Sequence, residues 1–148
     1  MNVIRVTKEF NFEMAHALYG YNGPCKNIHG HSYNLSVTLI GNVINEKENP
    51  INGMVIDFTD LKKIVQNSII SELDHTLILN GNSPHRDIKN NEDLFERILL
   101  VNFQPTCENL LLDFVGKIKS QLPENLKLHH LFLRETATSY AEWYAEDN

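Results

Sequence analysis

Two stretches near the start of the chain alternate between apolar and polar residues. From Val3 to His16 the even positions are apolar except at Lys8, and His16 ends the series. The odd positions of residues 29–39 form a second apolar series, and this one begins with two histidines. A period of two is typical of a half-buried strand. We therefore predict two strands joined by a loop over residues 19–25, where glycines and a proline favour turns.

Apolar residues spaced three to four positions apart predict two helices further along the chain. The first stripe covers residues 61–73, and either Thr59 or Asp60 is expected to cap it. The second helix follows Pro105 and extends to about residue 122, where a proline stops it. Glu108 then falls in its first turn, where the helix dipole favours an anion.

The remaining pattern completes an α+β domain. Apolar residues crowd both faces of 126–135, and 140–144 resembles a short closing strand, whereas 80–91 is polar and predicts a surface loop. The order β-β-α-α-β-β predicts a four-stranded antiparallel sheet with two helices on one face. Without repeats or low-complexity tracts, we expect one domain over residues 1–148.

Composition narrows the class of protein. The chain has 148 residues, with 13 Lys and Arg against 19 Asp and Glu, which gives a net charge of −6. An acidic chain argues against a nucleic-acid or anionic-membrane partner. Its two cysteines, Cys25 and Cys107, cannot form a disulfide framework, and we see no signal peptide or membrane-spanning run. A cytoplasmic protein is the expectation.

Seven histidines are the unusual feature of the composition. His29 and His31 lie on one strand face, about 6.5 to 7 Å apart along the chain. His16 joins them if the two strands form a hairpin. Three imidazoles around Zn²⁺ leave a fourth position open, as in catalytic sites. Two alternatives stay open: hydrogen-bonded core histidines, or Cys25 as a fourth ligand in a structural site of a binding module without catalysis.

Other residues are candidates for proton transfer and recognition. Cys25 beside a cation would have an increased thiolate fraction, and the adjacent pair Asp74-His75 could serve in proton transfer. Glu135, at the end of an apolar strand, could accept two N–H bonds from a guanidine-like ring, or could simply pair with its neighbouring arginine on the surface. Cys107 has no histidine or second cysteine near it in sequence, so we expect it to be structural.

In this order, the motifs resemble the 6-pyruvoyl-tetrahydropterin synthase family. The resemblance runs from about residue 10 to residue 144. Within that family, the three residues between Cys25 and His29, together with the ending ETATSY (135–140), resemble the 6-carboxy-tetrahydropterin synthase branch of queuosine and deazapurine biosynthesis. The motifs that carry the resemblance are FEMAH ending at His16, CKNIHGH from Cys25 to His31, MVIDF (54–58), LDH ending at His75, PTCENL (105–110) and RETATSY (134–140).

The resemblance implies a tunnelling fold, in which trimers close their sheets into a barrel and two trimers stack as a homohexamer. It implies an enzyme that converts 7,8-dihydroneopterin triphosphate to 6-carboxy-5,6,7,8-tetrahydropterin with loss of triphosphate and acetaldehyde, and the pyruvoyl product is the runner-up. The implied roles are zinc binding for His16, His29 and His31, proton abstraction for Cys25, proton relay for Asp74 and His75, pterin anchoring for Glu135, and substrate contacts for Thr106 and Glu108. We expect a local basic patch for the triphosphate from Lys26, Arg86 and Lys89.

Overall fold

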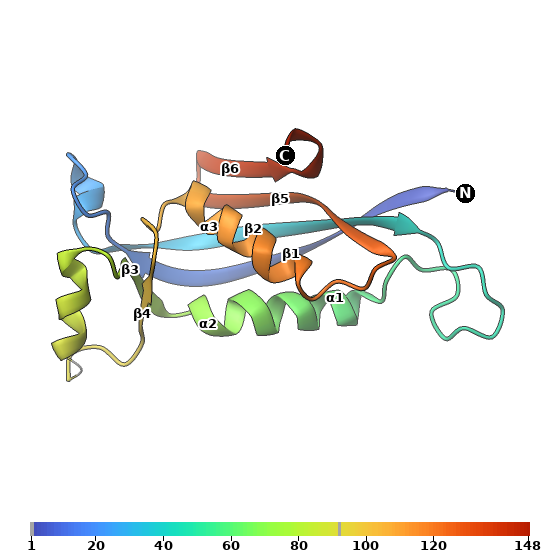
Figure 1. Cartoon of the computed structure of the whole chain (residues 1–148), viewed down its shortest axis with the longest axis horizontal. Coiled ribbons are helices and arrows are strands. Elements are labelled where there is room, and N and C mark those ends of the chain that lie inside the picture. The colour runs from blue at the N-terminus through green and yellow to red at the C-terminus, as the bar shows by residue number, and fades with distance from the viewer. Residues whose placement is uncertain (1, 92) are drawn as a thin grey trace.

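A long antiparallel pair of strands forms the centre of the computed structural model, which describes residues 2–91 and 93–148 (Figure 1). Strand β1 spans Val3–His16 and pairs with β2, which spans His29–Asn42. The register places His16 opposite His29 and Met14 opposite His31. Both strands predicted from the alternating pattern are confirmed, and they do form a hairpin.

Each predicted helix is present. The first begins as α1 (Phe58–Val65), continues through a π-helical segment (Gln66–Ile70) and ends as α2 (Ser71–Leu73). Its cap is Asp57, whose carboxylate accepts from the Thr59 backbone N–H at 2.7 Å, so the helix starts before the two predicted capping residues. Helix α3 spans Cys107–Lys119.

The sheet has six strands, so the prediction of a four-stranded antiparallel sheet was wrong in number. Strands β5 (Leu126–Thr136) and β6 (Ser139–Tyr144) extend it antiparallel beyond β2, as predicted. On the other side, β3 (Thr76–Asn80) runs parallel to the end of β1, and β4 (Ile98–Val101) runs parallel to β3. The strand order is β4-β3-β1-β2-β5-β6. The result is a mixed sheet in an α+β fold.

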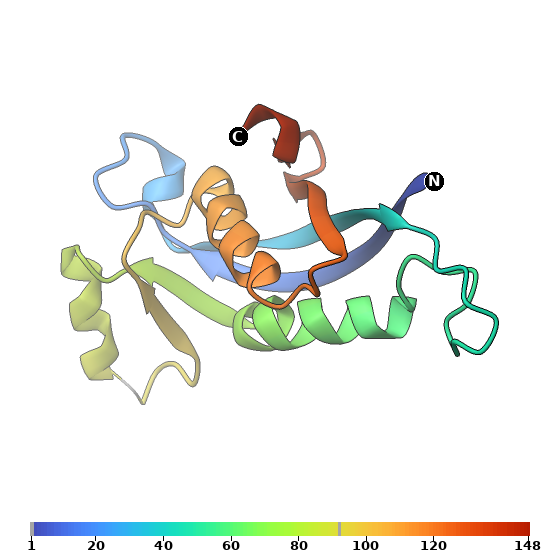
Figure 2. The ribbon, with the colours of Figure 1, turned by 45° about the vertical axis from the view of Figure 1, so that its right-hand side comes forward.

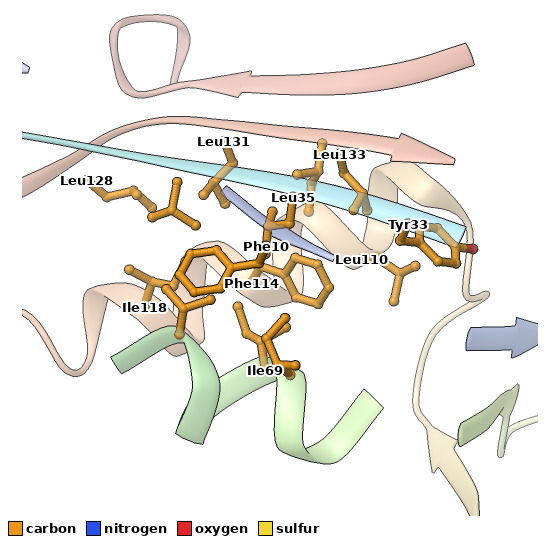
Figure 3. Packing of buried hydrophobic residues seen from close by; sticks show 14 of the residues in the cluster. Phe10, Tyr33, Leu35, Ile69, Leu110, Phe114, Ile118, Leu128, Leu131 and Leu133 are labelled. Atoms are coloured by element: carbon orange, nitrogen blue, oxygen red, sulfur yellow. The ribbon is translucent and has the colours of Figure 1, made fainter. Parts of the chain in front are cut away.

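Both helices cover the same face of the sheet, as predicted (Figure 2). Buried side chains from this face and from the helices make one apolar cluster, and Figure 3 shows α3 contributing Phe114 and Ile118 to it. A smaller cluster lies around Leu77 and Leu79 of β3. One face of the β1–β2 pair is therefore covered by the helices, and the other face is open and polar.

The segment predicted as an irregular loop over 80–91 is partly ordered. It carries a 3₁₀-helical segment, Pro84–Asn91, and it leads into β4. Beyond it, the Arg97 guanidinium donates to the backbone oxygens of Ser71, Glu72 and Asp74 at 2.6, 3.1 and 2.9 Å. Arg97 thus ties this segment to the end of α2. No helix within residues 2–91 or 93–148 is long and apolar enough to cross a membrane.

Candidate metal centre and its surroundings

Three histidines converge where β1 ends and β2 begins. The ligand nitrogens of His16, His29 and His31 all lie within 4.8 Å of one another. The Nε2 atoms of His16 and His29 are 3.1 Å apart. Because Zn–N bonds measure about 2.0–2.1 Å, two nitrogens on one tetrahedral ion lie roughly 3.3 Å apart. The hairpin therefore brings the predicted residues to a spacing that suits a metal.

Backbone carbonyls orient two of the three rings. Nδ1 of His16 donates to the Pro105 carbonyl at 2.7 Å, and Nδ1 of His29 donates to the Asn27 carbonyl at 2.7 Å. In this tautomer the Nε2 lone pair of each ring is available as a ligand. Burial lowers the pKa of both His16 and His31 from its ordinary value, which favours the neutral imidazoles that bind metals.

His31 supplies a direct test of fit. Its Nε2 atom is buried without a hydrogen-bond partner among the described residues. Buried polar atoms are normally satisfied, and a metal ion shared with the other two imidazoles would satisfy this one. Three imidazole donors suit zinc and other transition metals rather than magnesium or calcium. The residues present therefore fit a metal ion.

Glu135 lies beside the histidines. Its Oε1 atom is 3.5 Å from His16 Nε2 and 3.7 Å from His31 Nε2. It also accepts a hydrogen bond from the Tyr33 hydroxyl at 3.2 Å. This carboxylate thus faces the metal centre. The alternative of a surface pair with Arg134 is not formed, and the Arg134 guanidinium donates to the Ala137 carbonyl instead.

Cys25 lies in a short 3₁₀ helix, Pro24–Lys26, in the loop that joins β1 to β2. It is half-buried and has a free thiol. Among the described residues, the group of potential ligands within 4.8 Å of one another consists of the three histidines and does not include this thiol. The structural Cys-His₃ arrangement is therefore not formed here, and Cys25 remains a candidate for chemistry.

Asp74 and His75 form a pair next to the edge of β1. The Asp74 carboxylate accepts from the Glu13 backbone N–H at 2.9 Å, and the Glu13 carbonyl accepts from the His75 N–H at 2.6 Å. The Asp74 carboxylate is 3.1 Å from His75 Nδ1. The bond from Glu13, with smaller effects of His75 and Arg97, lowers the Asp74 pKa. The backbone of His75 is left-handed, with φ 58°.

The sheet separates this pair from the metal centre of the same chain. His75 is largely exposed and lines a pocket with Glu13, Ala15 and Ser32, and the lining of this pocket also includes His31. Glu13, Ala15 and Ser32 alternate along β1 and β2 with the residues that face the helices, so their side chains point to the other face. The structure thus brings together the histidines and Glu135, and it does not bring Asp74 and His75 to them.

The PTCENL segment has several structural tasks. The Thr106 hydroxyl caps α3 by accepting from the Asn109 N–H at 3.2 Å, and Glu108 is exposed in the first turn, as predicted. Cys107 is buried, its thiol donates to the Leu133 carbonyl, and burial raises its pKa to about 12. Cys107 is therefore the inert cysteine that the sequence predicts.

The cations expected to form a basic patch are only partly described. Lys26 is exposed beside Cys25. Arg86 is exposed and lies 3.9 Å from the carboxylate of Asp87. The side chain of Lys89 lies outside the described part of the chain. A triphosphate site at these residues stays a prediction.

Sequence reasoning missed three groups around the candidate site. The Pro105 carbonyl orients His16, Tyr33 contacts Glu135, and Arg97 holds the backbone of Asp74. The alternation along β2 does place Tyr33 on the histidine face, so its position was available as a signal. The other two contacts depend on the tertiary fold and leave no local pattern.

Comparison with known proteins identifies the chain's relatives. The family model described as 6-pyruvoyl tetrahydropterin synthase matches residues 5–146. A Haemophilus influenzae protein named 6-carboxy-5,6,7,8-tetrahydropterin synthase is 35% identical over 95% of this chain and 99% of its own length, and an Aquifex aeolicus protein of the same name is 31% identical over 95% and 98%. The solved structure of 6-pyruvoyl tetrahydropterin synthase from Caenorhabditis elegans shares the fold, with a TM-score of 0.68 and 23% identity over 98% of this chain and 97% of that one.

These matches cover nearly the whole chain and confirm the resemblance predicted from its motifs. The fold is the one seen in the Caenorhabditis elegans structure, and this chain's sheet includes two short parallel strands that the sequence pattern did not predict. The chain is thus an enzyme that belongs to the 6-pyruvoyl tetrahydropterin synthase family.

Proposed function

We propose that this chain is a zinc-dependent carbon–oxygen lyase acting as a single domain. It converts 7,8-dihydroneopterin triphosphate to 6-carboxy-5,6,7,8-tetrahydropterin, with loss of triphosphate and acetaldehyde, in queuosine biosynthesis. The observation that carries the proposal is the convergence of three oriented imidazoles on one point. The names of the Haemophilus influenzae and Aquifex aeolicus relatives support this product.

His16, His29 and His31 would hold Zn²⁺ through their Nε2 atoms. When bound, Zn²⁺ acts as a Lewis acid that polarises substrate oxygens and acidifies the neighbouring C–H groups. Three protein ligands leave a coordination position for substrate, as catalytic zinc sites require. The carbonyls of Pro105 and Asn27 keep two of the imidazoles in the ligating tautomer.

Cys25 is the proposed base that removes a carbon-bound proton. It lies four residues before His29 in a loop. The Leu18 backbone N–H donates to the Cys25 backbone carbonyl across this loop at 3.0 Å. That bond closes the loop next to the end of β1, which carries His16. A thiol does this work as its thiolate, and the loop leaves Cys25 half-buried rather than enclosed.

His75, oriented by Asp74, is the proposed proton relay, and it would serve the metal centre of a neighbouring copy. The two groups lie on opposite faces of the β1–β2 pair, so one chain does not hold them together. In a homohexamer built from two trimers, the His75 of one copy would lie next to the metal centre of another copy. Closing the sheets into a barrel would also cover free strand edges.

Glu135 would hold the pterin ring, because a carboxylate can accept two parallel N–H bonds from a guanidine-like edge. Its position beside His16 and His31 supports this assignment, since the ring would then lie in register with the metal. Thr106 and Glu108 would make further substrate contacts from the start of α3, where an anion is also favoured.

Incubation of the zinc-loaded protein with 7,8-dihydroneopterin triphosphate tests the proposal. Mass spectrometry should show 6-carboxy-5,6,7,8-tetrahydropterin, and an aldehyde assay should show stoichiometric acetaldehyde. The second candidate is the 6-pyruvoyl product, which the family model's own name favours; turnover without acetaldehyde would select it. A zinc-loaded sample that does not turn over would contradict both.

A further inference from the structure

Tyr33 connects the apolar core to the candidate metal centre. Its side chain is fully buried and stacks on Phe12, with ring centroids 5.1 Å apart and an interplanar angle of 7°. Figure 3 shows the phenol at the end of the cluster with its oxygen pointing out of it. That hydroxyl donates to Glu135 Oε1 at 3.2 Å. The donor is therefore fixed by packing, and it restrains a carboxylate that is itself partly exposed.

The restrained oxygen lies close to the metal ligands. Glu135 Oε1 is 3.5 Å from His16 Nε2 and 3.7 Å from His31 Nε2. Carboxylates are common zinc ligands, and these two distances are close to the roughly 3.3 Å between ligand atoms on one tetrahedral zinc ion, so this oxygen is a potential fourth ligand. Nevertheless, the group of ligand atoms within 4.8 Å of one another comprises only the histidines within the described residues.

A carboxylate cannot both fill that position and serve substrate. If Glu135 bound the metal, it would close the position at which substrate enters and would turn away from the pterin. Among the described residues, the Tyr33 hydroxyl donates a hydrogen bond to Glu135 Oε1, and this bond restrains the carboxylate. We propose that Tyr33 is a positioning residue that keeps the Glu135 carboxylate outside the metal's coordination sphere and directed at substrate. The inference rests on the proposed function for the role of Glu135.

The test compares Tyr33→Phe with the parent protein in two binding measurements. Neopterin affinity of the zinc-loaded protein is measured by fluorescence titration, and zinc affinity is measured by chelator competition. Tyr33→Phe should weaken neopterin binding about tenfold, the scale of a hydrogen bond to a charged group. It should tighten zinc binding about tenfold, a typical effect size for partners around metal ligands. A merely structural loss would weaken both.

A double-variant cycle attributes the effects to Glu135. In the Glu135→Gln background, adding Tyr33→Phe should change neither affinity further. The matched control is Tyr144→Phe, because the Tyr144 hydroxyl donates to Glu142 at 3.3 Å in a similar tyrosine–glutamate pair that lies beside His130 and not beside the three metal-ligand candidates. It should leave both affinities unchanged.

Unchanged affinities in Tyr33→Phe, or weakening of both, would overturn the inference, and so would effects that persist in the Glu135→Gln background. If Tyr33→Phe does not fold, Glu135→Gln tests the premise: zinc affinity should stay at the parent value, and a weakened zinc affinity would mean that Glu135 is already a ligand and would overturn the inference. A parent protein that does not bind neopterin would contradict the proposed function, whereas the zinc measurements would still test the position of Glu135.

Discussion

The two faces of the β1–β2 pair differ in burial and in chemistry. On the helix-covered face, cross-strand neighbours are buried and apolar, and the series ends in the metal-ligand candidates; its members are Phe10 with Leu35, Phe12 with Tyr33, and His16 with His29. On the open face the neighbours are polar; they are Glu9 with Ser36, Asn11 with Asn34, and Glu13 with Ser32. The same strands thus carry the partly buried metal-ligand candidates on one face and exposed polar residues on the other.

This difference explains how one short chain can provide unlike catalytic groups. Burial lowers the pKa of His16 and His31 and favours neutral metal ligands. The open face leaves His75 exposed next to Asp74. Since neighbouring strand residues point to opposite faces, the chain keeps the two sets apart, and the proposed assembly of copies would bring them together.

Removing a ligand from the covered face should have the largest effect. His16→Ala should lose zinc and reduce turnover by at least about 10³-fold, because both substrate polarisation and the open metal position depend on it. Zinc content by mass spectrometry and product formation measure this. The control is His129→Ala, which removes a half-buried imidazole that accepts from Arg5 at 2.7 Å and is not among the metal-ligand candidates. Full zinc occupancy in His16→Ala would contradict the assignment.

The two cysteines should differ strongly in alkylation rate. Burial raises the Cys107 pKa from 9.0 to about 12, so at pH 8 its thiolate fraction should be about 10³-fold below that of an ordinary thiol. Its reactivity should rise only as pH approaches that pKa or on unfolding. Iodoacetamide labelling followed by peptide mass spectrometry should therefore modify Cys25 first in the folded protein. Faster labelling of Cys107 would show that the covered face is open.

Core truncation should distinguish the two faces in stability. Phe114 is fully buried against Phe12, and Phe114→Ala should lower the free energy of unfolding by about 3–5 kcal/mol. Asn34→Ala on the open face should change it by no more than about 0.5 kcal/mol. Urea denaturation measures both. Equal losses would mean that the open face is as tightly packed as the covered one.

A smaller effect is expected from Arg97. Arg97→Met removes three hydrogen bonds to the carbonyls at the end of α2 and should cost about 1–2 kcal/mol. Arg86→Met is the control, since the Arg86 side chain is exposed and, among the described residues, makes one long contact, with Asp87. Thermal unfolding compares them. Identical melting temperatures would show that the segment containing Arg97 does not support the Asp74–His75 pair.

The long strands and the metal-ligand candidates were predictable because their signals are local. A period of two over β1 and β2 places His16, His29 and His31 on one face, and a short loop makes the hairpin. The helices followed from their apolar stripes, although Asp57 rather than a later residue caps the first. The motif order then led to the correct family, because it spans nearly the whole chain.

The parts that were missed depend on distant contacts. Strands β3 and β4 have only five and four residues. The periodicity of such short apolar runs does not tell whether they form a strand or a buried helical segment. Their parallel pairing joins segments far apart in the sequence. The Pro105 carbonyl contacts His16, and the Arg97 side chain contacts the Asp74 carbonyl; both contacts join residues far apart in the sequence. The separation of His75 from the metal centre also became visible only with the sheet in place.

Mixing two inactive variants tests the central claim that the two faces act together across copies. Cys25→Ala and His75→Ala should each reduce turnover of 7,8-dihydroneopterin triphosphate by about 10²–10⁴-fold. When the two are co-expressed as mixed oligomers, about a quarter of the sites should draw both intact groups from different chains, and activity should return to about that fraction of the parent value. Mixed oligomers that stay as inactive as the separate variants would contradict the account.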